Sequence, residues 1–435
     1  IKCGIADYTS FTTREMPAEK WGVLSFDLEK YGLPLIPQNI SEAGQQVWYG
    51  MPSPHELSPA IIMDGLNELG AKDNNALLWI QHETAIWPDT TKFITTLREL
   101  DIPKIVTLHT INFQSTETLS GLRIYQYDLL RELLPCVDAI TVFNSGVRQA
   151  VITAFPEYSE KVHVLKHGVH SYPDITSLSK IEAKERLNDF LLHESDIDET
   201  AKASLYRQRI LLDPNTIILG QAGFLCPFKQ SEVLYTVKDN LQKIIPHKRI
   251  VIMRIGSPRE ESQESYAKQL KRGQNGIDNF LLETWLPPDV FPLAQRAFDI
   301  NIYWPSKCTQ SGVLAHAFGA GAIVAGRDLE GMGKAMKEAG ALTDYNLGSL
   351  IMQIRNLILN PEIALETEES ALRYANRLSW NKQAQRHFDL ADRILHPMPF
   401  WFDLYELDTT DAIPQNIQVE ERAPSISMAH QESQT

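Results

Sequence analysis

The chain has 435 residues, of which 43% are hydrophobic and 22% charged, with a formal net charge of −14. This length predicts two domains, because it exceeds what one hydrophobic core usually serves. The acidic balance excludes a general nucleic-acid binder and leaves at most peripheral contact with an anionic membrane. The apolar runs fall far short of the roughly 20 residues of a membrane span. The scattered cysteines Cys3, Cys136, Cys226 and Cys308 form no CxxC pair, which favours reduced thiols in a cytoplasmic protein and no metal site.

The first part of the chain alternates short apolar runs with longer amphipathic ones. The apolar runs are typical of buried strands: WGVLSF (21–26), NALLWIQHE (75–83), KIVTLHT (104–110), AITVFNS (139–145) and VHVLKHGV (162–169). Helices are expected at 91–100 and 121–134, so residues 1–172 are predicted to form a doubly wound α/β domain with a parallel sheet. KCGIADYTSF (2–11) predicts a turn into a helix without a preceding strand. We therefore expect native residues upstream of this sequence.

The alternation breaks at residues 173–210, which are charged, helix-prone and too polar to predict a core. We expect a helical linker there. It restarts in residues 211–369, where strands are expected at TIILGQAG (216–223), RIVIMRIG (249–256), NFLLETWLP (279–287), FDINIYWP (298–305), GAIVAG (321–326) and GALTDY (340–345). This pattern predicts a second doubly wound sheet. A helical segment at 370–395 and a polar tail at 396–435 complete the chain.

Open α/β sheets bind ligands at the carboxyl ends of their strands. In the second domain, the loop after the strand at 298–305 carries Thr309, Gln310, Ser311, Gly312 and Val313. Thr309 and Ser311 are natural N-cap residues, and the free amides of the following turn would form an anion site. The alternative is an ordinary capped helix whose small residues only permit close packing.

Lys229 lies one loop earlier, after Pro227 and Phe228. Its ammonium group could meet the same phosphate as a point charge. The alternative is a solvated surface lysine.

The strand ends of the first domain carry polar side chains at the same kind of edge. These are Asp7 and Tyr8 in the first turn, His82 and Glu83 after the second predicted strand, and His109 after the third. A histidine there could position a hydroxyl group or titrate near neutral pH. Taken singly, each is as well explained by a structural role.

Aromatic residues at the edges of two loops are candidates for stacking on an acceptor sugar. They are Trp48, Tyr49 and Trp87, with Pro88 beside them. They fit a core position equally well.

These segments together resemble a known family. KCGIADYT, QHE, VTLHT, HGV, GFLxxxK and PSxxTQSGVLxxAxxxG occur in the order and spacing of the retaining glycosyltransferases of glycosyltransferase family 4. The resemblance extends to about residue 395. It implies a GT-B fold, in which two Rossmann-like domains face each other across a cleft. The second domain would hold a nucleotide sugar, the first would hold the acceptor, and the helices at 370–395, with Trp380, would cross back to the first domain.

The resemblance also implies roles for single residues. Gly4 matches a glycine turn near the diphosphate, His109 matches a histidine that contacts the transferred sugar, and Lys229 matches a lysine of the diphosphate clamp. Gly223 and Gln310 belong to the same two donor motifs, and Ser311, Gly312 and Val313 match the helix start that caps the phosphates.

The sequence departs from the family pattern at the donor site. Phe224 stands where the clamp has arginine, and Gln230 stands where it has glycine. Arg254 or Arg259 would have to supply the missing charge. His316 stands in place of a glutamate and would bond a ribose hydroxyl.

The resulting hypothesis is a hexosyltransferase that moves sugar from a UDP-sugar to a hydroxyl acceptor, a saccharide or lipid-linked saccharide, in polysaccharide or glycoconjugate synthesis. Without an Asp-x-Asp motif, no metal cofactor is expected, and the leaving diphosphate would deprotonate the acceptor. Two alternatives remain: a non-catalytic GT-B protein that binds a sugar or nucleotide, and a sugar-nucleotide epimerase or hydrolase.

Overall fold

The computed structural model describes residues 4–27, 46–71, 76–258 and 260–397. Contacts group the residues up to Leu395 into one compact unit. The predicted tail at 396–435 lies outside the described residues apart from its first two. Among the described residues, no helix is both long and apolar enough to cross a membrane.

The first part of the chain contains a four-stranded parallel sheet in the order β3-β4-β5-β6. The strands are β3 (Leu78–His82), β4 (Lys104–Leu108), β5 (Ala139–Val142) and β6 (Val162–Val164). Every residue of β4 and β5 is buried, as their β-branched sequences predict. The predicted strands at these positions are confirmed.

The first predicted strand lies elsewhere. β1 (Gly22–Phe26) pairs in parallel with β2 (Gln46–Met51) in a separate two-stranded sheet. The sequence pattern did not predict β2, because QVWYGM has neither strict alternation nor a continuous β-branched run. Trp48 on β2 lies against α2, since a Cβ atom on Gly65 would come within 2.5 Å of its ring.

Helices connect these strands, and their starts follow capping rules. They are α1 (Gly4–Arg14), α2 (Pro59–Glu68), α3 (Thr90–Glu99), α4 (Ile124–Leu133) and α5 (Ser145–Ala154). Asp89 accepts a hydrogen bond from the Lys92 amide at the start of α3, and Asn144 caps α5 in the same way. The helices expected at 91–100 and 121–134 are confirmed, with ends shifted by a few residues.

The second part contains a six-stranded parallel sheet in the order β12-β11-β10-β7-β8-β9. Its strands are β7 (Thr216–Ala222), β8 (Arg249–Ile255), β9 (Asn279–Leu282), β10 (Ile300–Tyr303), β11 (Val324–Arg327) and β12 (Leu342–Asp344). The order reverses between β7 and β10, which is the topological switch point of a doubly wound sheet. The carboxyl ends of β7 and β10 carry the predicted donor loops.

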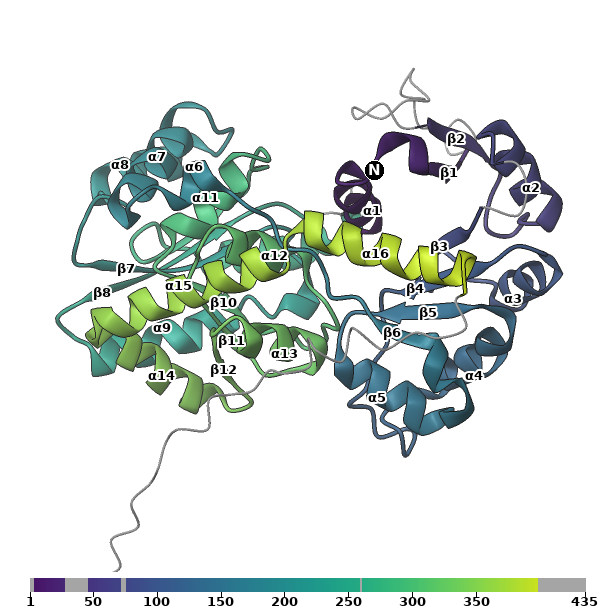
Figure 1. The fold of residues 1–435 in the computed structure, drawn as a ribbon. Coiled ribbons are helices and arrows are strands. Elements are labelled where there is room, and N and C mark those ends of the chain that lie inside the picture. The colour runs from purple at the N-terminus through teal and green to yellow at the C-terminus, as the bar shows by residue number, and fades with distance from the viewer. Residues whose placement is uncertain (1–3, 28–45, 72–75, 259, 398–435) are drawn as a thin grey trace, which may run out of the picture. The chain divides into compact units, whose positions relative to one another are not determined.

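Helices cover both faces of this sheet, as Figure 1 shows. They are α6 (Pro173–Thr176), α7 (Lys180–His193), α8 (Glu199–Gln208), α9 (Val233–Ile244), α10 (Glu264–Arg272), α11 (Val290–Ala297), α12 (Gly312–Gly319), α13 (Glu330–Glu338) and α14 (Leu347–Leu359). One apolar cluster joins α7, α8 and α11 to β7, β8 and β9, and another joins α9 and α14 to the strands.

The prediction that residues 173–210 are too polar for a core is wrong. Helices do form there, but Ala183, Leu187 and Leu191 on α7 are fully buried in the apolar cluster of the second sheet. Their spacing of four places them on one helix face, while Glu182, Glu185 and Arg186 are exposed. High average charge therefore concealed an amphipathic helix that belongs to the second core.

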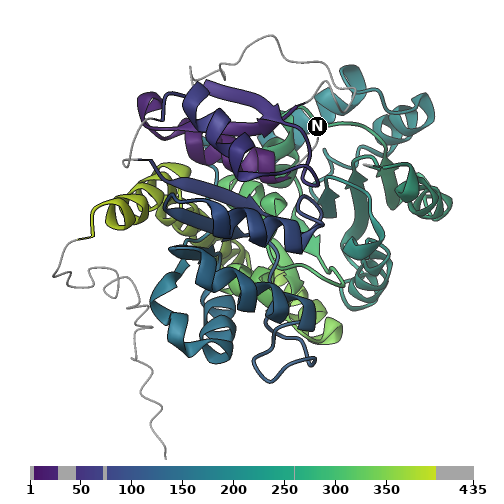
Figure 2. The same ribbon diagram turned by 90° about the vertical axis from the view of Figure 1, so that its right-hand side faces the viewer.

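The segment expected at 370–395 consists of the end of α15 (Pro361–Arg377) and of α16 (Trp380–Leu395). α15 packs on α12 of the second part, and α16 packs against α1 of the first. Leu390 of α16 lies in a cluster with Ile105 of β4 and Ala139 of β5. The last helix therefore returns to the first sheet, and Figures 1 and 2 both show it in yellow beside the purple α1.

Candidate functional site

The helix start predicted to bind an anion has the expected local geometry. Ser311 is the N-cap of α12, and its hydroxyl accepts a hydrogen bond from the Leu314 amide at 3.4 Å. Gly312 is exposed, and a Cβ atom there would meet nothing within 4 Å. The first turn of α12 is therefore open to a ligand, and its dipole favours a negative charge.

Lys229 lies next to this helix start. A Cβ atom built on Gly223 would lie 3.4 Å from the Lys229 ammonium nitrogen and 3.7 Å from Val313 Cγ2. Gly223 has a φ of +105°, a conformation that other residues rarely adopt, so the backbone there favours glycine. The glycine therefore lets the β7 loop bring Lys229 beside α12.

The Lys229 ammonium group lies in a poorly solvated position. Among the described residues, it makes no hydrogen bond or ion pair. Burial lowers the pKa of Lys229, and the thiols of Cys226 and Cys308 oppose this only in part. An anion bound beside it would stabilise the charged form of the ammonium group, so this position is suited to phosphate.

Arg254 does not supply the missing clamp charge, and that prediction is wrong. Its side chain is fully buried, and its guanidinium donates to the Ser231 carbonyl at 2.9 Å and to Asn279 Oδ1 at 2.8 Å. It also lies 4.6 Å from the centre of the Tyr235 ring. Arg254 holds the core of the β8 edge together and cannot reach a ligand. The other candidate, Arg259, lies outside the described residues.

The clamp position itself carries an aromatic pair. The rings of Phe224 and Trp285 lie 5.7 Å apart at the ends of β7 and β9, and half of the Trp285 surface is exposed. Lys229 is thus the positive charge that the described residues bring to Gly223 and Val313.

On the first sheet, Tyr8 forms the centre of a ring cluster. It is 3% exposed, and its hydroxyl lies 3.1 Å from His387 Nε2. Its ring makes edge contacts with His109 at 5.1 Å and Trp380 at 5.5 Å. Tyr8 therefore packs α1 against α16, and its predicted acceptor contact stays a prediction.

The two other candidates on α1 face outward. Asp7 and Gly4 are both exposed, and a Cβ atom on Gly4 would meet nothing within 4 Å. Burial raises the pKa of Asp7. Both remain accessible to a ligand.

His109 is half-buried at the end of β4. Its Nε2 lies 2.8 Å from Gln81 Oε1, and its ring contacts Tyr8 and Phe143. Burial, with smaller effects from His167 and His82, lowers its pKa to about 3. The ring is thus neutral at pH 7 and firmly positioned, and its sugar contact stays a prediction.

The remaining candidates on this edge belong to packing. His82 is 4% exposed, packs on Phe93 at 5.1 Å and has a pKa lowered by burial to about 4, and its acceptor role stays a prediction. Trp87 is buried on the same phenylalanine and donates to the Gln81 carbonyl at 2.9 Å. Glu83 accepts a hydrogen bond from Thr110 at 2.5 Å at the surface.

His316, which stands at a family glutamate position, belongs to a ring stack. Its ring lies 4.0 Å from that of His170 at 14°, and its Nδ1 lies 2.5 Å from the Tyr172 hydroxyl. Trp380 Nε1 donates to His170 Nδ1 at 3.3 Å. Burial lowers the pKa of His316 to about 4, so it offers a neutral ring where the family has a carboxylate.

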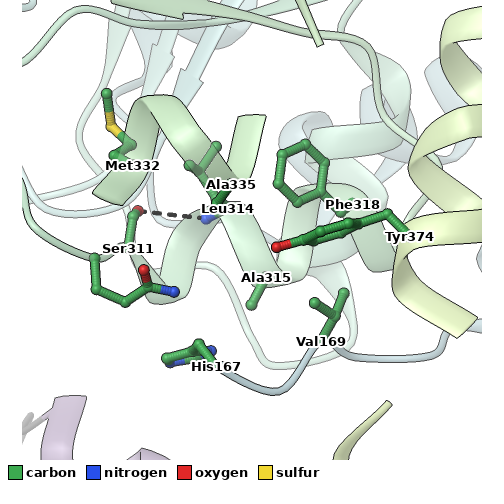
Figure 3. Close-up of a pocket in the computed structure, with 10 residues that line it drawn as sticks. His167, Val169, Ser311, Leu314, Ala315, Phe318, Met332, Ala335 and Tyr374 are labelled. Carbon is green, nitrogen blue, oxygen red and sulfur yellow. Dashed lines mark hydrogen bonds between the residues drawn. The ribbon is translucent and has the colours of Figure 1, made fainter. Parts of the chain in front are cut away.

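The sequence did not single out His167, His170 and Tyr172 as site residues, although HGV (167–169) was one of the segments that resemble the family. His167 lines a pocket together with Gln310 and Ser311, as Figure 3 shows. It also lines an adjoining pocket, with Asn144 and Lys334. Residues that follow strands of both sheets therefore line these two pockets.

Contacts from α13 to the loops of the first sheet border this pocket. The Glu330 carboxylate accepts from the Phe113 amide at 3.0 Å and the Gln114 amide at 3.3 Å. One turn on, Lys334 donates to the Ser145 hydroxyl, and Lys166 donates to Glu338 at 2.7 Å. One face of α13 therefore joins the two sheets beside the pocket.

Metal binding finds no support in this geometry. Within the ranges that the structure describes, no group of three or more His, Cys, Asp and Glu side chains could hold a metal ion. Independence from metal stays a prediction.

Neither protein-family models nor the curated protein sequences match this chain. Solved structures do. HepE from Anabaena, determined in complex with UDP, has a TM-score of 0.59 at 14% identity, with 90% of this chain and 96% of that chain covered. Its complex with UDP-glucose gives 0.58 at 13% identity over the same shares.

A UDP-forming α,α-trehalose-phosphate synthase from Burkholderia xenovorans has a TM-score of 0.57 at 13% identity, with 78% of each chain covered. At such identities the likeness concerns the fold. The predicted fold class is confirmed: the chain has an α/β architecture of two Rossmann-like parts, the GT-B fold of these structures.

Proposed function

We propose that this protein is a retaining glycosyltransferase that moves a hexose from a nucleoside diphosphate sugar to a hydroxyl acceptor. The observation that carries the proposal is the desolvated ammonium group of Lys229 beside the open first turn of α12. A diphosphate carries the charge that both features favour.

UDP is the proposed nucleotide. HepE has been determined with UDP and with UDP-glucose, and the trehalose-phosphate synthase is described as UDP-forming. Their fold is that of this chain, and both donor loops here follow the strands β7 and β10 at the switch point. A saccharide or lipid-linked saccharide is the proposed acceptor, within polysaccharide or glycoconjugate synthesis.

The proposed mechanism needs no metal. Lys229 and the amides at the start of α12 stabilise the charge that develops on the leaving diphosphate. An oxygen of the leaving diphosphate then takes the proton of the acceptor hydroxyl. The hydroxyl oxygen attacks the anomeric carbon from the face that the diphosphate leaves. His109, neutral and fixed by Gln81, contacts the transferred sugar.

One observation favours a non-catalytic sugar or nucleotide binder instead. Phe224 and His316 replace charged groups of the family pattern, and Arg254 is fully buried. The site is therefore short of charge, which weakens transition-state stabilisation more than ground-state binding.

The test is an assay of UDP-glucose and related donors with and without saccharide acceptors, in the presence of a chelator. Release of UDP that rises with acceptor, together with a product of retained anomeric configuration by NMR, supports the proposal. Binding without any turnover supports the non-catalytic binder, and products independent of acceptor support an epimerase or hydrolase.

Two variants separate chemistry from binding. His109→Ala is expected to lower turnover while nucleotide affinity is kept, because a contact to the reacting sugar strengthens in the transition state. Lys229→Ala is expected to lower both the turnover and the nucleotide affinity. Equal losses of affinity in the two variants would contradict the sugar contact of His109.

A further inference from the structure

His167 has a hydrogen-bonding state that its surroundings determine. Its Nδ1 lies 2.7 Å from the carbonyl oxygen of Gly168. A carbonyl oxygen can only accept, so Nδ1 carries the hydrogen, and Nε2 of the neutral ring is left with a lone pair. The ring is held by Tyr8 at 5.3 Å and by Trp380 at 5.2 Å.

The ring stays neutral at physiological pH. Burial lowers the pKa of His167 to about 4, although the hydrogen bond to Gly168 acts in the opposite direction. At pH 7, Nε2 is therefore an acceptor and cannot donate.

His167 borders the pocket that the donor helix also borders. His167, Gln310 and Ser311 line it together, and Figure 3 shows His167 across the pocket from the start of α12. Among the described residues, none donates a hydrogen bond to His167 Nε2. His109 differs, because its Nε2 is already bonded to Gln81.

His167 also lines a second pocket with Phe143 and Asn144, which follow β5 of the first sheet. A group that reaches Nε2 from the start of α12 would thus lie between the two sheets. In a nucleotide sugar whose phosphates occupy the α12 turn, the diphosphate joins the nucleoside to the sugar. Under the proposed function, the sugar is the part that faces the acceptor side on the first sheet.

We propose that His167 Nε2 accepts a hydrogen bond from one hydroxyl group of the transferred sugar and so helps to select the donor. The inference rests on the proposed function. It assigns to His167 a contact with the sugar and none with the nucleotide.

The experiment compares affinities for UDP and UDP-glucose by calorimetry in the wild type and in His167→Phe. Removing a neutral hydrogen bond is expected to weaken UDP-glucose about threefold to tenfold, with UDP changed less than twofold. His167→Gln, whose side-chain oxygen can accept, is expected to recover part of the loss. The ratio of the two affinities does not depend on the amount of folded protein.

A series of deoxy-glucose donors identifies the hydroxyl. One deoxy analogue should bind the wild type more weakly than UDP-glucose does. The same analogue should bind His167→Phe as tightly as UDP-glucose does, because the missing hydroxyl and the missing acceptor belong to the same hydrogen bond. The matched control is His387→Phe. His387 is also buried with a pKa lowered to about 4, but its nitrogens are engaged by Gln383 and Tyr8, and it lines neither pocket.

The control variant is expected to lower the melting temperature and leave the UDP-glucose to UDP ratio unchanged. Equal losses of UDP and UDP-glucose in His167→Phe, or a deoxy series without such a pair, would overturn the inference alone. A wild type that binds neither UDP nor UDP-glucose would overturn the proposed function and this inference with it.

Discussion

The carboxyl edges of the two sheets differ in how completely their polar groups are engaged. At the first sheet, His109, Tyr8 and His387 are tied to one another or to neighbours through rings and hydrogen bonds, and burial keeps the histidines neutral. At the second sheet, the Lys229 ammonium group has no polar partner among the described residues, and Gly312 faces open space. The rings of the first edge are neutral and packed against one another, whereas the second edge is open and favours an anion.

This difference indicates which part of a nucleotide sugar each edge is suited to bind. An unpaired, desolvated cation gains most from a charged ligand. Neutral rings in fixed positions cannot balance a phosphate, but they can orient hydroxyl groups. The comparison therefore divides a nucleotide sugar between the edges, with its diphosphate on the second and its sugar toward the first.

The largest expected effect separates a buried cation from a ligand-binding one. Arg254→Ala leaves the Ser231 carbonyl and Asn279 without their donor and opens a cavity. We expect a loss of about 3–5 kcal/mol in the free energy of unfolding. Urea unfolding measures it, and UDP affinity per folded molecule should stay constant. A selective loss of UDP affinity with normal stability would return Arg254 to the phosphate site.

Lys229→Ala should behave in the reverse way. A charge-assisted contact to phosphate contributes about 1.5–3 kcal/mol, so UDP should bind roughly tenfold to a hundredfold more weakly. The melting temperature without ligand should fall little or rise, because a desolvated ammonium is removed. The matched control is Lys307→Ala, an exposed lysine of the neighbouring β10 loop. The same affinity in both variants would make Lys229 an ordinary surface lysine.

The neutral histidines predict a pH dependence of stability. Burial lowers the pKa values of His167 and His316 to about 4 and also lowers that of His170. Below about pH 6.5 the unfolded chain takes up protons that the folded chain refuses, so stability is full above pH 6.5 and is lost as pH falls toward 4. Each histidine contributes up to about 1.4 kcal/mol per pH unit.

Urea unfolding at pH 7.5 and pH 5.5 measures this effect above the range in which carboxyl groups titrate. His316→Gln is expected to reduce the dependence on pH. Equal free energies of unfolding at the two pH values would show that the ring cluster opens readily to solvent.

The smallest expected effect concerns the cap of α12. Ser311→Ala removes the hydroxyl that accepts from Leu314, and the helix start should lose about 1 kcal/mol. Because the amides remain, UDP affinity should fall less than in Lys229→Ala. Titration of both variants with UDP checks the order. A larger loss in Ser311→Ala would mean that the hydroxyl itself binds the ligand.

The strands of both sheets could be predicted because their buried, β-branched runs are local signals, as in KIVTL of β4. The start of α12 was predictable for the same reason, since a cap is read within four residues. The core role of α7 was missed, because its charged face outweighed Leu187 and Leu191 in the average.

The ring cluster lay beyond sequence reasoning. His167 contacts Tyr8 of α1, and both His167 and His170 contact Trp380 of α16. These helices lie more than 150 residues away along the chain, and only the tertiary fold brings them to the two histidines. Periodicity carries no information on such contacts. For the same reason, the sequence could not show that Arg254 points into the core and not toward the ligand.

The most direct test of the central claim is a calorimetric titration of the wild-type protein with UDP, GDP and ADP in the presence of a chelator. We expect heat of binding for UDP, with the same dissociation constant after magnesium or manganese replaces the chelator. No heat for any of the three nucleotides at millimolar concentration would contradict it.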